Sequence, residues 1–420
     1  MSLTLRPYQE RIVSSIINEL NHYSKPFIVD SFQASGKSLM IAELVRRLGE
    51  PVLILCMNKE LVEQDRDKLV GQGVDATMYS ASAGEKIISD VTVGTINSLY
   101  THPEFCERFA VVIVDEADQL PCDNPKSMYM KLLSKIKVKV VGLTGTAFRM
   151  VKRFGTDKRG AVVYTTQIRA LNRIPMEHGF FWGKIIHGIS YKELLDEKYV
   201  APIQYYVQDT DRSMLRVNST GADYTEDSLE DYGKTNRVAV AETTYGAYLR
   251  LKPKRILVTV PNIEDAEAIA EMLKDKVSTA VLHSKLPKKE RTRIVNEYKD
   301  GFIRVVVQVM MLNVGFDLPA LDVVVFARPC LSLRIWCQTV ARGIRLDPYD
   351  EDKVCKIIDM SGMIKQFGRI EDVRIDKEEG GFRSIVRGTY GIISEKVLSE
   401  VNIAELHAAR PPKVVPKLYN

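Results

Sequence analysis

Short, continuous apolar runs recur along the chain and alternate with segments of helical periodicity. The runs are mostly apolar and continuous rather than alternating, as expected for strands that are buried on both faces of a parallel sheet. In the first third of the chain, these runs cover residues 27–29, 52–56, 91–93, 111–114 and 138–141. Helical patterns at residues 38–48 and 59–69 lie between them. This order predicts an α/β domain with a mostly parallel sheet flanked by helices.

The same alternation begins again after residue 255. The second set of predicted strands covers residues 256–260, 279–282, 305–309, 323–326 and 354–358, and helical patterns at 263–274 and 287–299 separate them. We therefore predict two tandem α/β domains, at residues 1–150 and 237–370. The remaining residues form an inter-lobe connector or accessory region, 151–236, and a C-terminal extension, 371–420. Residues 209–232 are polar and acidic and are predicted to be exposed.

Composition excludes several classes of protein. The 420 residues are 45% hydrophobic and 27% charged, which excludes a disordered chain. No run of 18 apolar residues is present, and the N-terminus lacks a secretory pattern, so a cytoplasmic protein of a bacterium or an infected host is expected. The six cysteines show no C-x-x-C spacing, which argues against a zinc or iron–sulfur site. The net charge of +5 permits a polyanionic partner without requiring one.

A phosphate-binding loop is predicted at residues 31–38, between a strand and a helix. Its last four residues are Ser35, Gly36, Lys37 and Ser38. Backbone N–H groups at the start of such a helix face an anion, the lysine reaches the outer phosphates, and the hydroxyl of Ser38 can bind Mg²⁺. The first glycine of the usual pattern is replaced by Ser31.

Two adjacent carboxylates, Asp115 and Glu116, follow the apolar run at 111–114. Ligands of open α/β sheets bind at the carboxyl ends of the strands. Asp115 is therefore predicted to hold Mg²⁺, and Glu116 to orient and deprotonate the attacking water. A solvated acidic turn is the alternative interpretation.

With these motifs the chain resembles the superfamily 2 helicases, and the resemblance covers residues 5–370. In the first domain, Gln9 matches the adenine-recognition segment. Two motifs that contact the nucleic-acid strand, here called strand-gripping motifs, are matched by residues 58–64 and by residues 94–96, which include Thr95. The motif that links the ATP state to DNA contact, here called the coupling motif, is matched by residues 142–147. The resemblance implies two tandem RecA-like domains that use ATP and Mg²⁺.

The second domain carries the other motifs in the expected order. Nucleic-acid contact is implied for His283, Ser284 and Lys285, and for the strand at 305–311. Nucleotide contact is implied for Gly315 and Asp317, and an arginine-finger role for Gln338, Arg342 and Arg345. Arg342 and Arg345 are three residues apart and would share one face of a helix.

The residues 115–118, Asp-Glu-Ala-Asp, suggest an RNA helicase of the DEAD-box type, but two other motifs differ from that type. The coupling motif contains Thr144-Gly145-Thr146 instead of Ser-Ala-Thr, and the finger motif begins with Gln338 instead of His-Arg. The set is more similar to the DNA-directed branch with UvsW-, RadD- and RecG-type motors. That branch implies a monomer that acts on single-stranded, forked or branched DNA in repair, recombination or replication. An RNA helicase and an ATP-switched duplex-binding protein remain open.

Three further features have ordinary explanations beside functional ones. His178, His187 and His283 do not have the spacing of metal ligands. The aromatic run at 180–182 is either a base-stacking wedge or part of a core. The basic residues between 285 and 293 are either solvated helix charges or phosphate contacts.

Overall fold

The computed structural model describes residues 4–156, 162–176, 179–218, 221–311, 318–378 and 384–394. The chain divides into two compact units. The first contains the described parts of residues 1–149, 169–193 and 374–386. The second contains the described parts of residues 150–168, 194–373 and 387–420. Each unit is described by itself below.

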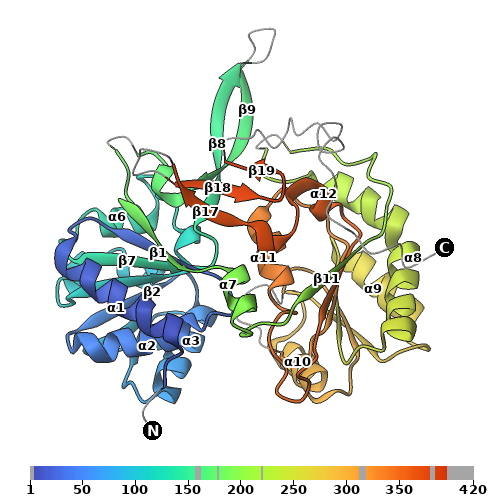
Figure 1. Ribbon diagram of the computed structural model, residues 1–420, viewed down its shortest axis with the longest axis horizontal. Coiled ribbons are helices and arrows are strands. Elements are labelled where there is room, and N and C mark those ends of the chain that lie inside the picture. The colour runs from blue at the N-terminus through green and yellow to red at the C-terminus, as the bar shows by residue number, and fades with distance from the viewer. Residues whose placement is uncertain are drawn as a thin grey trace. The chain divides into compact units, whose positions relative to one another are not determined.

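The first unit is built on an eight-stranded sheet of order β10-β1-β7-β6-β2-β5-β3-β4. Figure 1 labels three of its strands, β1, β2 and β7. All its pairs are parallel except β3 with β4. The strands are β1 (Phe27–Ser31), β2 (Val52–Cys56), β3 (Thr77–Ser80), β4 (Glu85–Lys86), β5 (Val91–Thr95), β6 (Val111–Asp115), β7 (Lys139–Thr144) and β10 (Lys184–Ile189). The helices are α1 (Pro7–His22), α2 (Lys37–Leu48), α3 (Lys59–Gly71), α4 (Ile96–Leu99), α5 (Pro103–Cys106) and α6 (Met128–Leu133), and α7 (Tyr191–Asp196) contains the boundary between the units.

The central strands of this sheet are apolar on both faces for a structural reason. Every residue of β2 and β6 is buried, because both strands have neighbours on either side and helices connect them. Their continuous Val, Ile and Leu runs suit that environment. The carboxyl end of β6 then brings Asp115 to the same edge of the sheet as the end of β1.

The second unit contains an all-parallel, six-stranded sheet of order β11-β16-β15-β12-β14-β13. Its strands are β11 (Ile203–Val207), β12 (Ile256–Thr259), β13 (Thr279–Leu282), β14 (Val305–Gln308), β15 (Val323–Phe326) and β16 (Cys355–Asp359). Its helices are α8 (Glu226–Leu251), α9 (Ile263–Leu273), α10 (Lys288–Asp300), α11 (Leu333–Val340) and α12 (Met363–Phe367).

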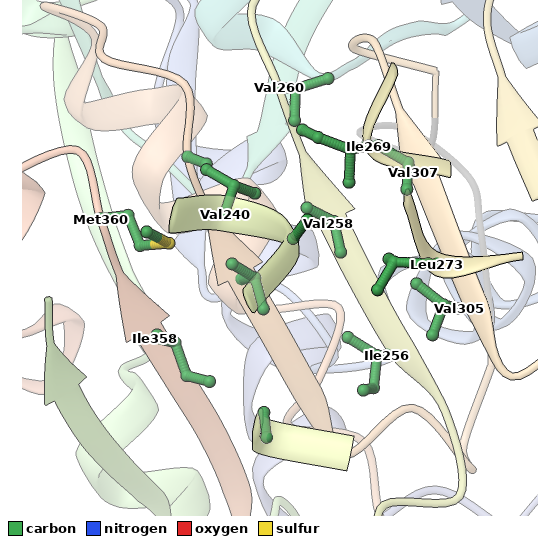
Figure 2. Packing of buried hydrophobic residues seen from close by; sticks show 14 of the residues in the cluster. Val240, Ile256, Val258, Val260, Ile269, Leu273, Val305, Val307, Ile358 and Met360 are labelled. Carbon is green, nitrogen blue, oxygen red and sulfur yellow. The ribbon is translucent and has the colours of Figure 1, made fainter. Parts of the chain in front are cut away.

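The core of the second unit lies where α8 and α9 pack on this sheet. Figure 2 shows Val240 of α8 and Leu273 of α9 beside Val258, Val305 and Ile358 from three of the strands. All five side chains are almost fully buried. Burial of each such side chain contributes about 1.5–3 kcal/mol to stability, which makes the sheet a rigid base for the loops at its edge.

Two smaller sheets complete the described structure. A two-stranded ribbon is formed by β8 (Phe148–Thr156) and β9 (Val162–Ala170). A three-stranded sheet is formed by β17 (Arg374–Lys377), β18 (Ser384–Gly388) and β19 (Gly391–Ile392).

The structure confirms the predicted fold class but divides the predicted connector differently. Within residues 151–236, β10 adds an edge strand to the first sheet and β11 adds one to the second. The expectation of an exposed segment is wrong for its last part, since α8 begins at Glu226 and Tyr232 is 1% exposed. Such edge strands pair with partners far along the chain, which local composition does not reveal.

No helix among the described residues is long and apolar enough to span a membrane.

Candidate functional site

The predicted phosphate loop turns tightly from β1 into α2. Ala34 and Gly36 both have positive φ, 69° and 78°, and Gly36 is the N-cap of α2. A side chain at Gly36 would be strained at this φ, and its Cβ would lie 2.6 Å from Nε2 of Gln9, which would have to move. This backbone turns successive N–H groups toward the helix N-terminus, where an anion is favoured.

Residues of the loop and of α1 hold this conformation. Ser31 donates from its hydroxyl to Ser35 Oγ at 2.9 Å, which explains how a serine serves where a glycine is usual. The carbonyl oxygen of Ser35 accepts from the hydroxyl of Tyr8 at 2.7 Å and from Gln9 Nε2 at 2.9 Å. Oε1 of Gln9 accepts from the backbone N–H of Arg6. Gln9 therefore lies against the loop, and its role in reading a base stays a prediction.

The structure brings Lys37 and the two adjacent carboxylates together. Nζ of Lys37 lies 3.5 Å from Oε1 of Glu116, although the two residues are 79 positions apart in the sequence. Burial opposes protonation of Lys37, but the carboxylates of Glu116, Asp115 and Asp118 outweigh it and raise the pKa of the lysine. The lysine is therefore a permanent cation at the mouth of the loop.

The carboxylates next to Lys37 suit a divalent cation. Among the described residues, Asp115 Oδ1 and Glu116 Oε2 are buried without a hydrogen-bond partner. Burial, together with the Asp65 and Glu116 carboxylates, raises the pKa of Asp115 well above its usual value. Buried carboxylate oxygens without donors fit Mg²⁺ and its bound water. Asp115 and Ser38 would hold the ion, which would neutralise phosphate charge.

The sequence did not indicate that Asp65 belongs to this cluster. Asp65 is a buried residue of α3, and burial raises its pKa while a hydrogen bond to Asp115 lowers it. Oδ2 of Asp65 accepts from Sγ of Cys56 at 3.4 Å. The available signal was a polar residue four positions after Leu61, on the apolar face of α3.

The coupling motif contacts the acidic motif directly. Thr144, at the end of β7, donates from its hydroxyl to Asp118 Oδ1 at 2.7 Å and accepts from the Thr146 N–H at 3.1 Å. A Cβ at Gly145 would lie 2.6 Å from Cγ of Gln33 in the phosphate loop. The two motifs and the loop therefore form one packed unit.

The residues predicted to contact nucleic acid differ in accessibility. Thr95 is 2% exposed, and its hydroxyl bonds to the hydroxyls of Ser98 and Ser80. His283 is 8% exposed at the end of β13. Ser284 and Lys285 are exposed. Of the set, Ser284 and Lys285 are thus directly available to a ligand.

The finger motif follows a different path from the one expected. Gln338 is buried in α11, which ends at Val340. Arg342 and Arg345 therefore do not share a helix face, and that expectation is wrong. Arg342 is 8% exposed and lies in the turn after the helix, where its N–H donates to the Thr339 carbonyl. The predicted nucleotide contacts Gly315 and Asp317 lie outside the described residues.

The remaining candidates have structural explanations where they are described. Trp182 is fully buried and packs over Gly142, so it belongs to the core of the first unit. His187 pairs with Glu193 at 2.7 Å. No group of three potential metal ligands occurs in the part of the chain that the structure describes. His178 lies outside it.

Replacing Glu116 by Gln should slow ATP hydrolysis at least about 100-fold while ATP still binds. The amide keeps the size of the side chain but cannot accept the proton of the attacking water. Single-turnover hydrolysis and binding of a fluorescent ATP analogue would measure the two steps. Glu107→Gln is the control, because that carboxylate accepts from the Lys137 backbone instead. Loss of ATP binding in Glu116→Gln would contradict the assignment and indicate a structural role.

Comparisons with known families agree with the two units. Residues 2–149 match the family described as "Type III restriction enzyme, res subunit". Residues 239–347 match the "Helicase conserved C-terminal domain" family.

Two curated relatives illustrate the range of similar proteins. A "51.5 kDa protein" of a Lactococcus phage is 24% identical over 343 residues, which cover 79% of this chain and 65% of the relative. The "DNA 3'-5' translocase XPB2" of Sulfurisphaera tokodaii is 21% identical, with 82% of this chain and 79% of the relative covered. The chain spans between 51% and 65% of the length of the first three curated relatives.

A solved structure shows the same fold. The "ATP-dependent Type ISP restriction-modification enzyme LlaBIII bound to DNA" aligns with a TM-score of 0.57 at 15% identity, covering 87% of this chain and 28% of that enzyme. At this identity the likeness concerns the fold alone. The two family matches, one on each RecA-like domain, together with the order of the motifs, make the chain a member of the superfamily 2 DNA helicases and translocases.

Proposed function

We propose that the protein is an ATP-dependent DNA helicase or translocase that remodels forked or branched DNA, acting as a monomer in repair, recombination or replication. One observation carries the hydrolytic part of the proposal. The phosphate loop, Lys37 and the Asp115–Glu116 pair meet at one edge of the first sheet. Lys37 would bind phosphate, Asp115 would hold Mg²⁺, and Glu116 would take the proton of water.

The hydrogen bond between Asp118 and Thr144 supports coupling of hydrolysis to movement. Asp118 lies two residues after the proposed base, and Thr144 opens the segment that continues into the β8–β9 ribbon. A change of charge at Glu116 would therefore act on that segment through a short, buried chain of contacts.

The distribution of positive charge supports a nucleic-acid partner. Between Phe148 and Ala170 the sequence has six Lys or Arg residues and one Asp, a formal charge of +5 that equals the net charge of the whole chain. The rest of the protein is therefore neutral overall. Such a concentrated charge favours a polyanion over a small acidic substrate.

A second basic group lies at the start of α10. Lys285, Lys288 and Lys289 are exposed, and their ammonium groups have no ion pair or hydrogen bond among the described residues. Arg293, on the same helix, is instead paired with Glu290 and Glu297. The three lysines are thus available for phosphates, whereas the arginine is neutralised within the protein.

Replacing Lys285, Lys288 and Lys289 by Gln should weaken DNA binding and flatten its salt dependence. Each lost phosphate contact removes about 0.7–0.9 from the slope of log K against log salt, so the triple variant should lose about 2–3. Fluorescence anisotropy at several salt concentrations would measure the slope. The control Arg293→Gln should keep the slope of the unaltered protein. A triple variant with the same slope as the unaltered protein would show that these lysines do not contact DNA phosphates.

The proposed function is tested by the ATPase rate with single-stranded DNA, duplex, fork, four-way junction and RNA. We expect the largest stimulation with forked or branched DNA. Stronger stimulation by RNA would favour the RNA-helicase alternative. Stimulation by DNA without strand displacement or translocation would favour an ATP-switched duplex-binding protein. Binding should not depend on base sequence, because a moving grip must contact phosphates and sugars.

A further inference from the structure

A buried lysine lies beneath the segment that carries the proposed arginine finger. Lys353 is only 5% exposed, and its ammonium group donates to two backbone carbonyls. One is the carbonyl of Arg345, at 2.6 Å, and the other is that of Pro319, at 2.5 Å. A single side chain therefore ties together two segments separated by 26 residues.

Both segments belong to the motifs proposed to act on the nucleotide. Arg345 is the last arginine of the finger motif. Pro319 comes two residues after Asp317, the end of the motif implied in nucleotide contact. The loops carrying these motifs leave the sheet at separate strands, β15 lying between them in sequence. Without a cross-link, their relative positions would depend on loop packing alone.

The surroundings of Lys353 show that its charge is costly to bury. Burial lowers the pKa of Lys353 to about 8, while Cys355, Asp322 and Asp347 act in the opposite direction and Lys254 adds to the lowering. Among the described residues, neither carboxylate bonds the Lys353 ammonium group. Asp322 accepts from the backbone N–H groups of Lys254 and Arg255, and Asp347 accepts from the Lys254 ammonium group. An apolar residue would avoid this cost.

A second lysine contacts the same turn in a different way. Lys254 pairs with Asp347 at 2.7 Å and with Asp350 at 2.9 Å, and its side chain is 38% exposed. Lys254 therefore holds the turn through the side chains of Asp347 and Asp350. Lys353 instead bonds the backbone carbonyl of Arg345.

We propose that Lys353 is a positioning residue for ATP hydrolysis. By donating to the carbonyls of Arg345 and Pro319, it fixes the backbone of Arg345 and thereby the position of the Arg345 guanidinium. The inference rests on the proposed function, in which Arg345 stabilises the transferred phosphoryl group. Misplacing a charged donor by about 1 Å costs on the order of 100-fold in comparable chemistry, so an effect on kcat is expected.

The test compares Lys353→Met with Lys254→Met in the full chain. Lys353→Met should lower the DNA-stimulated kcat about 10-fold or more, with KM for ATP and DNA affinity within twofold. Lys254→Met, which breaks ion pairs in the same turn but leaves the Arg345 carbonyl bonded, should keep kcat within twofold. A kcat within twofold of the unaltered protein in Lys353→Met would overturn the inference.

A double variant separates positioning from general damage. If Lys353 acts through Arg345, then Lys353→Met combined with Arg345→Ala should have the same kcat as Arg345→Ala alone. Effects that multiply would show an independent structural role and overturn the inference. If Arg345→Ala by itself leaves kcat unchanged, the proposed role of Arg345 fails. If Arg345→Ala lowers kcat and Lys353→Met does not, only the positioning role fails.

A pH profile decides the question if Lys353→Met does not fold. In the unaltered protein, log kcat should fall as the pH rises through about 8, because the two bonds lose their charge. In Lys353→Arg the guanidinium stays charged, and this fall should move above pH 10. Coincident profiles for the two proteins would overturn the inference.

Discussion

Lys37→Ala is expected to abolish ATP hydrolysis, with turnover reduced about 10³-fold or more, and to leave DNA binding within twofold. The ammonium group of Lys37 lies 3.5 Å from Glu116, and the neighbouring carboxylates raise its pKa, which favours the charged form. Its loss would remove a phosphate contact and leave the buried carboxylates of Asp115 and Glu116 without their neutralising partner. Steady-state ATPase assays and DNA titrations measure the two properties.

Arg46→Ala is a suitable control for this variant. Arg46 lies on the same helix as Lys37, but it pairs with Glu43 of its own helix and its side chain is 41% exposed. Exposed pairs of this kind contribute about 0–1 kcal/mol, so its loss should leave both properties unchanged. Turnover within threefold of the unaltered protein in Lys37→Ala would contradict the phosphate-loop assignment.

Arg345→Ala is expected to lower kcat about 10³-fold while ATP affinity changes little. A finger that stabilises charge in the transition state contributes to kcat and not to ground-state binding. Arg342→Ala should act in the same direction. Because Arg342 is 8% exposed, its removal should also lower the melting temperature. Single-turnover hydrolysis and calorimetric ATP binding would separate the effects.

The exposed Arg304 provides the control for the finger variants. Its guanidinium donates to the backbone carbonyl of Lys254, at the other end of the strands, and Arg304→Ala should leave kcat within twofold. A normal kcat with weaker ATP binding in Arg345→Ala would indicate a ground-state contact and would exclude the finger role.

Local patterns in the sequence determined the two α/β units and most of their strands. The apolar runs at 52–56 and 323–326 coincide with β2 and β15, in which every residue is buried. These predictions succeed because a strand buried on both faces must be apolar at every position, which is visible without its partners. The phosphate loop and the two carboxylates at the end of β6 were equally visible, since each depends on a short segment and on the strand that leads into it.

Elements whose partners are distant in sequence were decided by the tertiary structure. The strands β10 and β11 became parts of different sheets through pairing with β1 and β16. The long helix α8 has few apolar residues in its first turns, so its sequence shows only a weak helical periodicity. In the folded protein, Tyr232 from this part of the helix is buried. In such elements the surroundings supply the stabilisation, and propensity alone is a poor guide.

The same distinction separates the predictable site residues from those that were missed. Lys37 and Glu116 were recognised because their own segments carry the motif. Asp65 and Lys353 act through a partner 50 residues away or through two backbone carbonyls, and no local pattern marks them. A buried charge is tolerated only where folding places its partners around it. The residues proposed for the chemistry therefore lie in short motifs that the sequence shows directly. The residues that hold them in place depend on which distant segments the fold brings together.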